Sequence, residues 1–219
     1  MLERILEPEA MDTPAEAESY DSMDHTQANA AFVTRLFELG ASGRMLDIGT
    51  GPGHMPPMIC DRDPAATIVG VDLAHQMIRA AERNLTRTPH GTRITYRHMD
   101  AKELAFSDGE FDAVYSNTIL HHIPDPRPFL MEARRVLRPG AVLLVRDLFR
   151  PATHELLESL VETHAAGCDD RQRGLFADSL HAAFTPEELR AIADESGLAD
   201  AKIVIDTDRH MSLQLPAAG

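Results

Sequence analysis

The stretch Arg44–Gly53, with the sequence RMLDIGTGPG, constrains the fold more than any other part of the chain. Met45, Leu46 and Ile48 form the short apolar run expected of a buried parallel strand. Three glycines at alternate positions follow it, and a turn without side chains lets a ligand lie against the backbone. Open α/β sheets bind ligands beyond the carboxyl ends of their strands, so we expect Asp47 to face that crevice. The string predicts a cofactor site.

The rest of the chain alternates short apolar runs with amphipathic helical patterns, which predicts a single doubly wound α/β domain. The predicted strands are 44–48, 67–72, 93–100, 111–117, 141–145, 202–205 and 211–215. The predicted helices are 24–39, 54–60, 74–85, 129–137, 152–166 and 185–196, with a polar loop at 167–174.

Two further acidic residues follow predicted strands. Asp72 lies 19 residues beyond Gly53, a position suited to accepting hydrogen bonds from both hydroxyls of a ribose. Its alternative role is to cap the next helix. Asp100 closes the third strand, where binding a ligand and capping a helix are again the two alternatives. Three neighbouring strand ends therefore carry carboxylates.

The string D-I-G-T-G-P-G resembles the first motif of the class I S-adenosylmethionine-dependent methyltransferases. The run Ser116–Ile123 and the stretch V-L-R-P-G resemble the ubiquinone- and menaquinone-biosynthesis type within that family. The resemblance implies a Rossmann-like, mostly parallel seven-stranded sheet of order 3-2-1-4-5-7-6, with strand 7 antiparallel. Asn117–Leu120 departs from the N-P-P-Y motif of methyltransferases that act on adenine or glutamine amides, which argues against such substrates.

The resemblance also implies the cofactor, S-adenosylmethionine, and its product, S-adenosylhomocysteine. The amino-acid end would lie at the glycine turn, the ribose at Asp72, the adenine at Asp100 and Ala101, and the methionine moiety beside Asn117. The full set of expected cofactor-binding residues is Tyr20, Asp47, Gly49, Thr50, Gly51, Gly53, Asp72, Leu73, Met77, Asp100, Ala101, Asn117 and His122.

His121 and His122 stand side by side just past the fourth strand. We expect His121 to act as a base or to contact the substrate, the alternative being that it only packs or caps. Paired histidines can also suggest a metal. Neighbouring side chains point in different directions, however, and no nearby Cys, Asp or Glu has the spacing of a companion ligand, so we expect no metal site.

Composition excludes several classes of function. The 219 residues suit one domain with a sizeable core. With 35 acidic against 21 basic residues, the net charge of −14 argues against nucleic acid as a partner. The two cysteines, Cys60 and Cys168, suggest neither a disulfide framework nor a zinc site. Without a signal peptide or an apolar stretch long enough to span a membrane, we expect a cytoplasmic protein.

Residues 1–23 are acidic and contain Pro8 and Pro14, which favours an irregular, exposed segment ahead of a methyltransferase domain at 24–219. We hypothesise that residues 12–25 form a lid that orders when the cofactor binds, with Tyr20 at its methionine end. The alternative is a solvated tail.

The expected activity is transfer of a methyl group from S-adenosylmethionine to a small molecule by in-line displacement. Two alternatives stay open. One is a protein that binds the cofactor without turnover. The other is an NAD-dependent oxidoreductase, against which the G-x-G-x-G spacing and the absence of a Tyr-x-x-x-Lys pair both argue. The sequence leaves the oligomeric state open.

Overall fold

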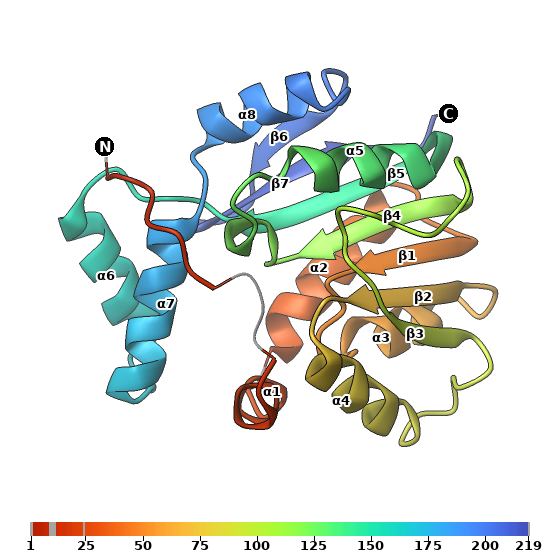
Figure 1. The fold of residues 1–219 in the computed structure, drawn as a ribbon, viewed down its shortest axis with the longest axis horizontal. Coiled ribbons are helices and arrows are strands. Elements are labelled where there is room, and N and C mark those ends of the chain that lie inside the picture. The colour runs from red at the N-terminus through yellow and green to blue at the C-terminus, as the bar shows by residue number, and fades with distance from the viewer. Residues whose placement is uncertain (1, 9–11, 24, 219) are drawn as a thin grey trace.

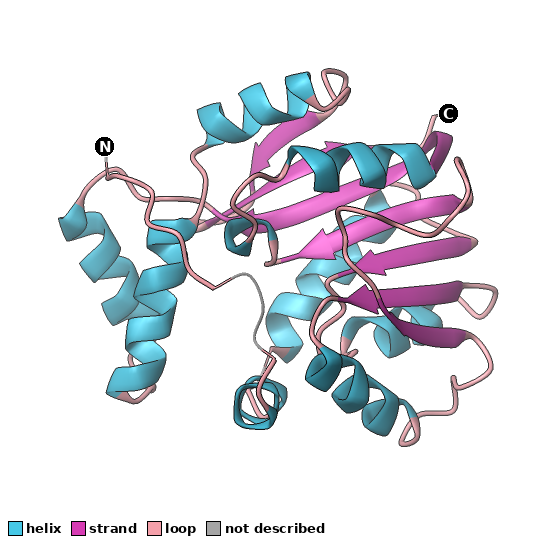
Figure 2. Cartoon of the chain, in the orientation of Figure 1, coloured by secondary structure: helices cyan, strands magenta, loops and turns pink. Residues whose placement is uncertain are grey.

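The computed structural model describes residues 2–8, 12–23 and 25–218, and its centre is a seven-stranded sheet with helices on both faces (Figures 1 and 2). The strand order is β3-β2-β1-β4-β5-β7-β6, and β7 is antiparallel to β5 and β6, as predicted. The strands are β1 (Arg44–Ile48), β2 (Thr67–Asp72), β3 (Ile94–His98), β4 (Phe111–Asn117), β5 (Leu137–Leu148), β6 (Lys202–Ile205) and β7 (His210–Leu215). β5 is longer at both ends than the sequence predicted.

Alternate residues of each strand face opposite sides of the sheet, and each side has its own core. Met45 of β1 packs in the layer of α2, α3 and α4, whereas its neighbour Leu46 packs in the layer of α5 and α8. The helices are α1 (Pro14–Asp21), α2 (Thr26–Glu38), α3 (Met55–Arg62), α4 (His75–Leu85), α5 (Arg127–Val136), α6 (His154–His164), α7 (Asp170–Ala182) and α8 (Pro186–Glu195), with a short 3₁₀ turn, η1 (Leu120–His122).

The described part of the amino-terminal segment is largely exposed, as its composition predicted, but it is not irregular throughout, because residues 14–21 form α1. Thr13 and Glu16 form a reciprocal capping box at the start of α1, and Pro14 occupies the first turn, where its missing N–H costs nothing. Ala17 of α1 is buried against Ala74 and Met77. The predicted domain boundary at residue 24 lies outside the described residues.

Residues 2–8, which we call the amino-terminal strap, lie against η1 and the end of α7. The Arg4 guanidinium donates hydrogen bonds to the carbonyls of His121, Ile123, Pro124 and Ala182. It also lies over the Phe184 ring, 3.7 Å from the centroid. The backbone N–H of Ile5 donates to the His181 carbonyl at 3.2 Å. The strap is therefore held by residues far along the chain.

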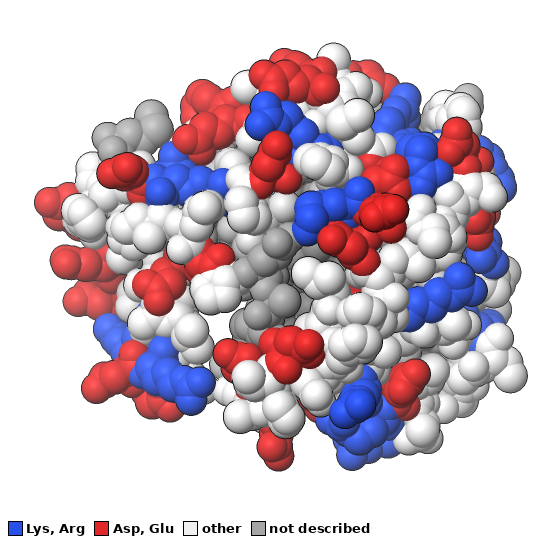
Figure 3. Space-filling view, in the orientation of Figure 1, with Lys and Arg blue, Asp and Glu red and all other residues white. Residues whose placement is uncertain are grey.

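Helix α7 overturns part of the predicted polar loop at 167–174. Asp169 caps it through a capping box with Gln172, so the helix begins at Asp170. In Figure 1, α6 and α7 lie beyond the ends of the strands toward which the arrowheads point. Within the described residues, none of the helices combines the length and apolarity needed to cross a bilayer. The face drawn in Figure 3 carries basic side chains in separate groups among acidic ones.

Candidate functional site

A cavity of about 810 Å³, its open mouth included, lies at the carboxyl ends of β1, β2 and β4. The chain winds outward from β1 through β2 to β3, and in the other direction through β4 and β5, so the cavity lies at the point where the winding direction reverses. Open α/β sheets bind their ligands at such points.

The glycine turn forms one wall of the cavity, and its three glycines have different reasons to lack a side chain. All three have positive φ angles. A Cβ on Gly49 would lie 2.4 Å from Ile119, and one on Gly53 would lie 2.4 Å from the Tyr96 hydroxyl. A Cβ on Gly51 would meet only the Tyr20 ring, at 3.9 Å. Gly51 therefore exposes backbone to the cavity, whereas Gly53 allows close packing behind it.

Asp72 ends β2 at the middle of the cavity. Its Oδ2 accepts a hydrogen bond from the Gly51 N–H at 2.8 Å, and its Oδ1 accepts one from the Ala74 N–H at 2.9 Å. Burial raises the pKa of Asp72, and these two hydrogen bonds oppose that rise. Each carboxylate oxygen offers a second lone-pair direction, so capping α4 and binding ribose hydroxyls are compatible roles.

The prediction that Asp47 faces the crevice is wrong. Its side chain is fully buried and accepts a hydrogen bond from the Thr50 hydroxyl at 2.7 Å. The reason is strand alternation: Asp47 points to the same side as Met45, into the layer that also holds Tyr115. Burial raises the pKa of the Asp47 carboxyl to about 7. Asp47 and Thr50 therefore stabilise the glycine turn from its buried side.

The ends of β3 and β4 complete the cavity. Asp100 lies two residues beyond β3, and its Oδ1 is 3.2 Å from the Lys102 ammonium. Asn117, the last residue of β4, accepts a hydrogen bond from Arg146 at 2.9 Å. Thr118 follows with a φ of 59°, a conformation rare outside glycine. The Thr118 side chain is hydrogen-bonded to Tyr20 of α1, which also lines the cavity.

The paired histidines occupy different environments. His122 lines the cavity, whereas His121 is buried behind it. His121 Nδ1 lies 2.5 Å from Asp147, and its Nε2 lies 3.2 Å from Glu7 of the strap. Burial disfavours the imidazolium, but Asp147 and Glu7 outweigh this effect and raise the pKa of His121 to about 9. His121 does not line the cavity, so the structure does not place it where it could contact a substrate there directly.

The predicted residues that line the cavity are Tyr20, Gly49, Gly51, Asp72, Leu73, Met77, Asp100, Ala101, Asn117 and His122. The predicted residues placed behind its walls are Asp47, Thr50, Gly53 and His121. The lining residues that the sequence did not single out are Ile48, Val71, Ala74, Met99, Lys102, Thr118, Ile119 and Ile123. Nearly all of these residues are next to a predicted one in the sequence. Their position near the ends of predicted strands could therefore have identified them as lining residues.

The argument against a metal missed one residue. The side chain of Glu7 meets those of His121 and His122, with Oε1 at 3.2 Å and 3.1 Å from their nitrogens. Glu7 precedes the histidines by more than one hundred residues, so no local spacing could reveal it.

Comparisons with known proteins agree with this geometry. A family model described as a methyltransferase domain matches residues 46–145. The chain is 31% identical over 204 residues to a malonyl-[acyl-carrier protein] O-methyltransferase from Geobacter sulfurreducens, an alignment that covers 92% of this chain and 73% of that protein. It is 29% identical over 172 residues to a demethylmenaquinone methyltransferase from Porphyromonas gingivalis, covering 78% and 70%.

The fold is similar to that of a solved SAM-dependent methyltransferase from Aquifex aeolicus, with a TM-score of 0.69 and 15% identity over 95% of this chain and all of that one. The cavity can take the cofactor of such enzymes, because Gly51 places no side chain in it and each Asp72 oxygen can accept a further hydrogen bond. The sheet order, the glycine turn and the sequence relatives together show that this chain belongs to the class I S-adenosylmethionine-dependent methyltransferases.

Proposed function

We propose that the protein transfers the methyl group of S-adenosylmethionine to a small-molecule acceptor by in-line displacement. The observation that carries the proposal is the cavity, which is lined by the glycine turn and by the ends of several strands, and also by Tyr20 of α1 and His122 of η1. A cofactor lying on Gly51 and Asp72 would leave part of this lining for an acceptor. The quinone and malonyl-carrier substrates named for the relatives support an acceptor outside the nucleic acids.

The chemistry asks little of the protein beyond alignment. The sulfonium methyl is already activated, so the enzyme must hold the two reactants in line and exclude water. A base is needed only for an acceptor that must lose a proton. Tyr20, brought by α1 and bonded to Thr118, covers the cavity at the end of β4. We assign it to closing the site and Asn117 to the methionine end of the cofactor.

The ribose assignment of Asp72 gives the direct test. Charge-assisted hydrogen bonds contribute about 1.5–3 kcal/mol each, so Asp72→Ala is expected to weaken cofactor binding at least ~10-fold. Asp63→Ala is the matched control, because Asp63 Oδ1 accepts from the Ala65 N–H at 2.9 Å, just as Asp72 accepts from Ala74, but lies before β2. Calorimetry with S-adenosylhomocysteine measures both.

The result has two informative directions. Weakened binding in Asp72→Ala with unchanged binding in Asp63→Ala supports the site. Equal affinity in a folded Asp72→Ala variant would reject the ribose assignment. Mass spectrometry of an incubation with labelled S-adenosylmethionine and candidate phenols, quinols and carboxylates then distinguishes methyl transfer from binding without turnover.

A further inference from the structure

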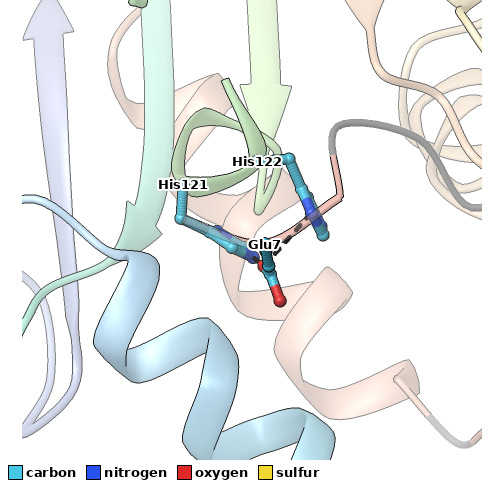
Figure 4. Close-up of side chains that lie close together, drawn as sticks. All are labelled: Glu7, His121 and His122. Atoms are coloured by element: carbon cyan, nitrogen blue, oxygen red, sulfur yellow. Dashed lines mark ion pairs between the residues drawn. The ribbon is translucent and has the colours of Figure 1, made fainter. Parts of the chain in front are cut away.

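The cluster of Glu7, His121 and His122 lies at the edge of the cofactor cavity, which His122 lines, and the chemistry above assigns no role to Glu7 or His121. Glu7 comes from the amino-terminal strap, and the two histidines come from η1 after β4. Figure 4 shows the Glu7 carboxylate between the two imidazole rings. All three side chains are largely withdrawn from solvent, with 11% exposure for Glu7, 4% for His121 and 21% for His122.

The two distances from Glu7 to the histidines are slightly shorter than the edges of a metal coordination tetrahedron. Glu7 Oε1 lies 3.2 Å from His121 Nε2 and 3.1 Å from His122 Nδ1. Zinc binds nitrogen and carboxylate oxygen at about 2.0–2.2 Å, which places tetrahedral ligands about 3.3–3.5 Å apart. The three ligand atoms all lie within 4.8 Å of one another, so an ion needs only a small opening of the cluster.

Asp147 supplies the support that a metal-binding histidine requires. It lies 2.5 Å from His121 Nδ1 and accepts a hydrogen bond from the His121 backbone N–H at 3.0 Å. Zinc binding would displace the proton from Nε2, the atom that faces Glu7, and keep the proton on Nδ1. Metal-bound histidines regularly donate their other N–H to a carboxylate in this way.

The charges of the cluster are also suited to a dication. Glu7 and Asp147 bring two carboxylates into a nearly enclosed space, where each needs a compensating charge. In the structure His121 lies against both carboxylates, and the Arg4 guanidinium adds positive charge near Asp147. A divalent ion between two neutral histidines and Glu7 would compensate for both.

We propose that Glu7, His121 and His122 bind one zinc ion, which fastens the amino-terminal strap to η1. Two imidazoles and one carboxylate are a donor set that zinc favours, and they leave a fourth position open. The Pro8 carbonyl lies 3.2 Å from His122 Nδ1, within hydrogen-bond distance, and zinc binding would replace that contact. Since His122 also lines the cavity, the ion would fix part of the cavity wall.

Zinc titration of the full-length, chelator-treated protein against a competing indicator tests the proposal, with elemental mass spectrometry giving the stoichiometry. We expect one zinc per chain in the wild type and at least ~10-fold weaker binding in Glu7→Gln, since even outer partners of a metal site contribute 10–100-fold. The matched control is His164→Asn, which removes another His–carboxylate pair, His164–Asp208 at 2.7 Å. Cys168→Ser controls for binding to the exposed thiol.

Cobalt gives a second measurement that does not depend on affinity. Co²⁺ in a four-coordinate site absorbs visible light far more strongly than hydrated Co²⁺, so the wild type and both controls should become coloured and Glu7→Gln should not. At free zinc about 100-fold above Kd, the melting temperature should also rise by about 5–10 °C.

Two results would overturn the proposal. One is the absence of saturable one-to-one zinc binding in the wild type, which would leave the cluster as a hydrogen-bonded ion pair. The other is equal zinc affinity in wild type and Glu7→Gln. Cofactor binding measured by calorimetry on the same samples keeps this test separate from that of the methyltransferase site, because either can fail while the other holds.

Discussion

The absence of a side chain at Gly51 leaves the backbone of the turn accessible from the cavity. Its backbone is the part of the turn open to the cavity, and its φ of 54° lies in the left-handed region. Gly53 has a similar φ of 74° but packs against Tyr96, whose hydroxyl donates a hydrogen bond to the Gly53 carbonyl at 3.1 Å. The same residue type therefore serves binding at one position and packing two residues later.

We expect Gly51→Val to abolish cofactor binding, because the branched side chain would enter the space that the cofactor needs. The conformational strain should cost only ~1–2 kcal/mol of stability. Gly53→Ala is the matched comparison, since its Cβ would collide with Tyr96 and lower the melting temperature more than it lowers affinity. Calorimetry and thermal unfolding measure the two effects. A Gly51→Val variant that melts normally and still binds cofactor would make the turn structural only.

The sequence predicted correctly which residues lie at the ends of strands. It failed where the question was which side of the sheet a side chain faces. Asp72, at the last position of β2, reached the cavity as expected. Asp47, one residue before the end of β1, did not. Its alternation with Met45 was readable in the sequence and indicated the α2–α4 layer. Glu7 could not be found, because its contact with η1 depends on how the strap crosses the finished fold.

At the scale of elements, α1 is the segment most suited to opening and closing the cavity. It buries Ala17 against α4 and brings Tyr20 to Thr118, and its other residues are largely exposed. A short helix with so small a buried face has little stability of its own. The hypothesised lid, residues 12–25, contains this helix, although Asp24 lies outside the described residues.

We expect hydrogen exchange in residues 14–21 to slow when S-adenosylhomocysteine is added, because the ligand adds contacts to Tyr20. Peptides from α8, on the opposite layer of the sheet, provide the internal control and should exchange equally with and without ligand. Unchanged exchange in residues 14–21 would show that α1 does not act as a lid.

The sequence contained the signal for α1, and composition concealed it. T-P-A-E at residues 13–16 is a capping box with proline at the first helical position. The acidic, proline-containing segment around it nevertheless predicted irregular structure. The sheet was predictable because each of its strands is a distinct apolar run, and because family resemblance fixed their order. Helix α7 was missed for the same reason as α1: its start, at Asp169, is polar.

At the scale of the whole molecule, Asp47 should make stability depend on pH. Burial raises the pKa of this carboxyl from an ordinary 3.8 to about 7. Between these two values the folded protein keeps a proton that the unfolded chain has lost. The free energy of unfolding therefore falls as pH rises from about 4 to about 7 and levels off above that.

Asp47→Asn removes this titration and keeps an acceptor for Thr50. We expect the stability of the wild type relative to Asp47→Asn to fall by a few kcal/mol between pH 4.5 and pH 8, on the order implied by ~1.4 kcal/mol per pKa unit. Urea unfolding of the cofactor-free proteins at several pH values measures the difference. Parallel profiles for the two proteins would show that Asp47 titrates normally.

The amino-terminal strap has a consequence for the order in which the molecule is built. Arg4 is synthesised 178 residues before Ala182, whose carbonyl it binds. Closing so long a loop brings a large entropic cost, and such distant contacts form late in folding. We therefore expect Glu7, which also accepts a hydrogen bond from Ser179 of α7, to join His121 late. A growing chain has β1 to β5 and the glycine turn before α7 is synthesised, so the wall beside them is completed after they are present.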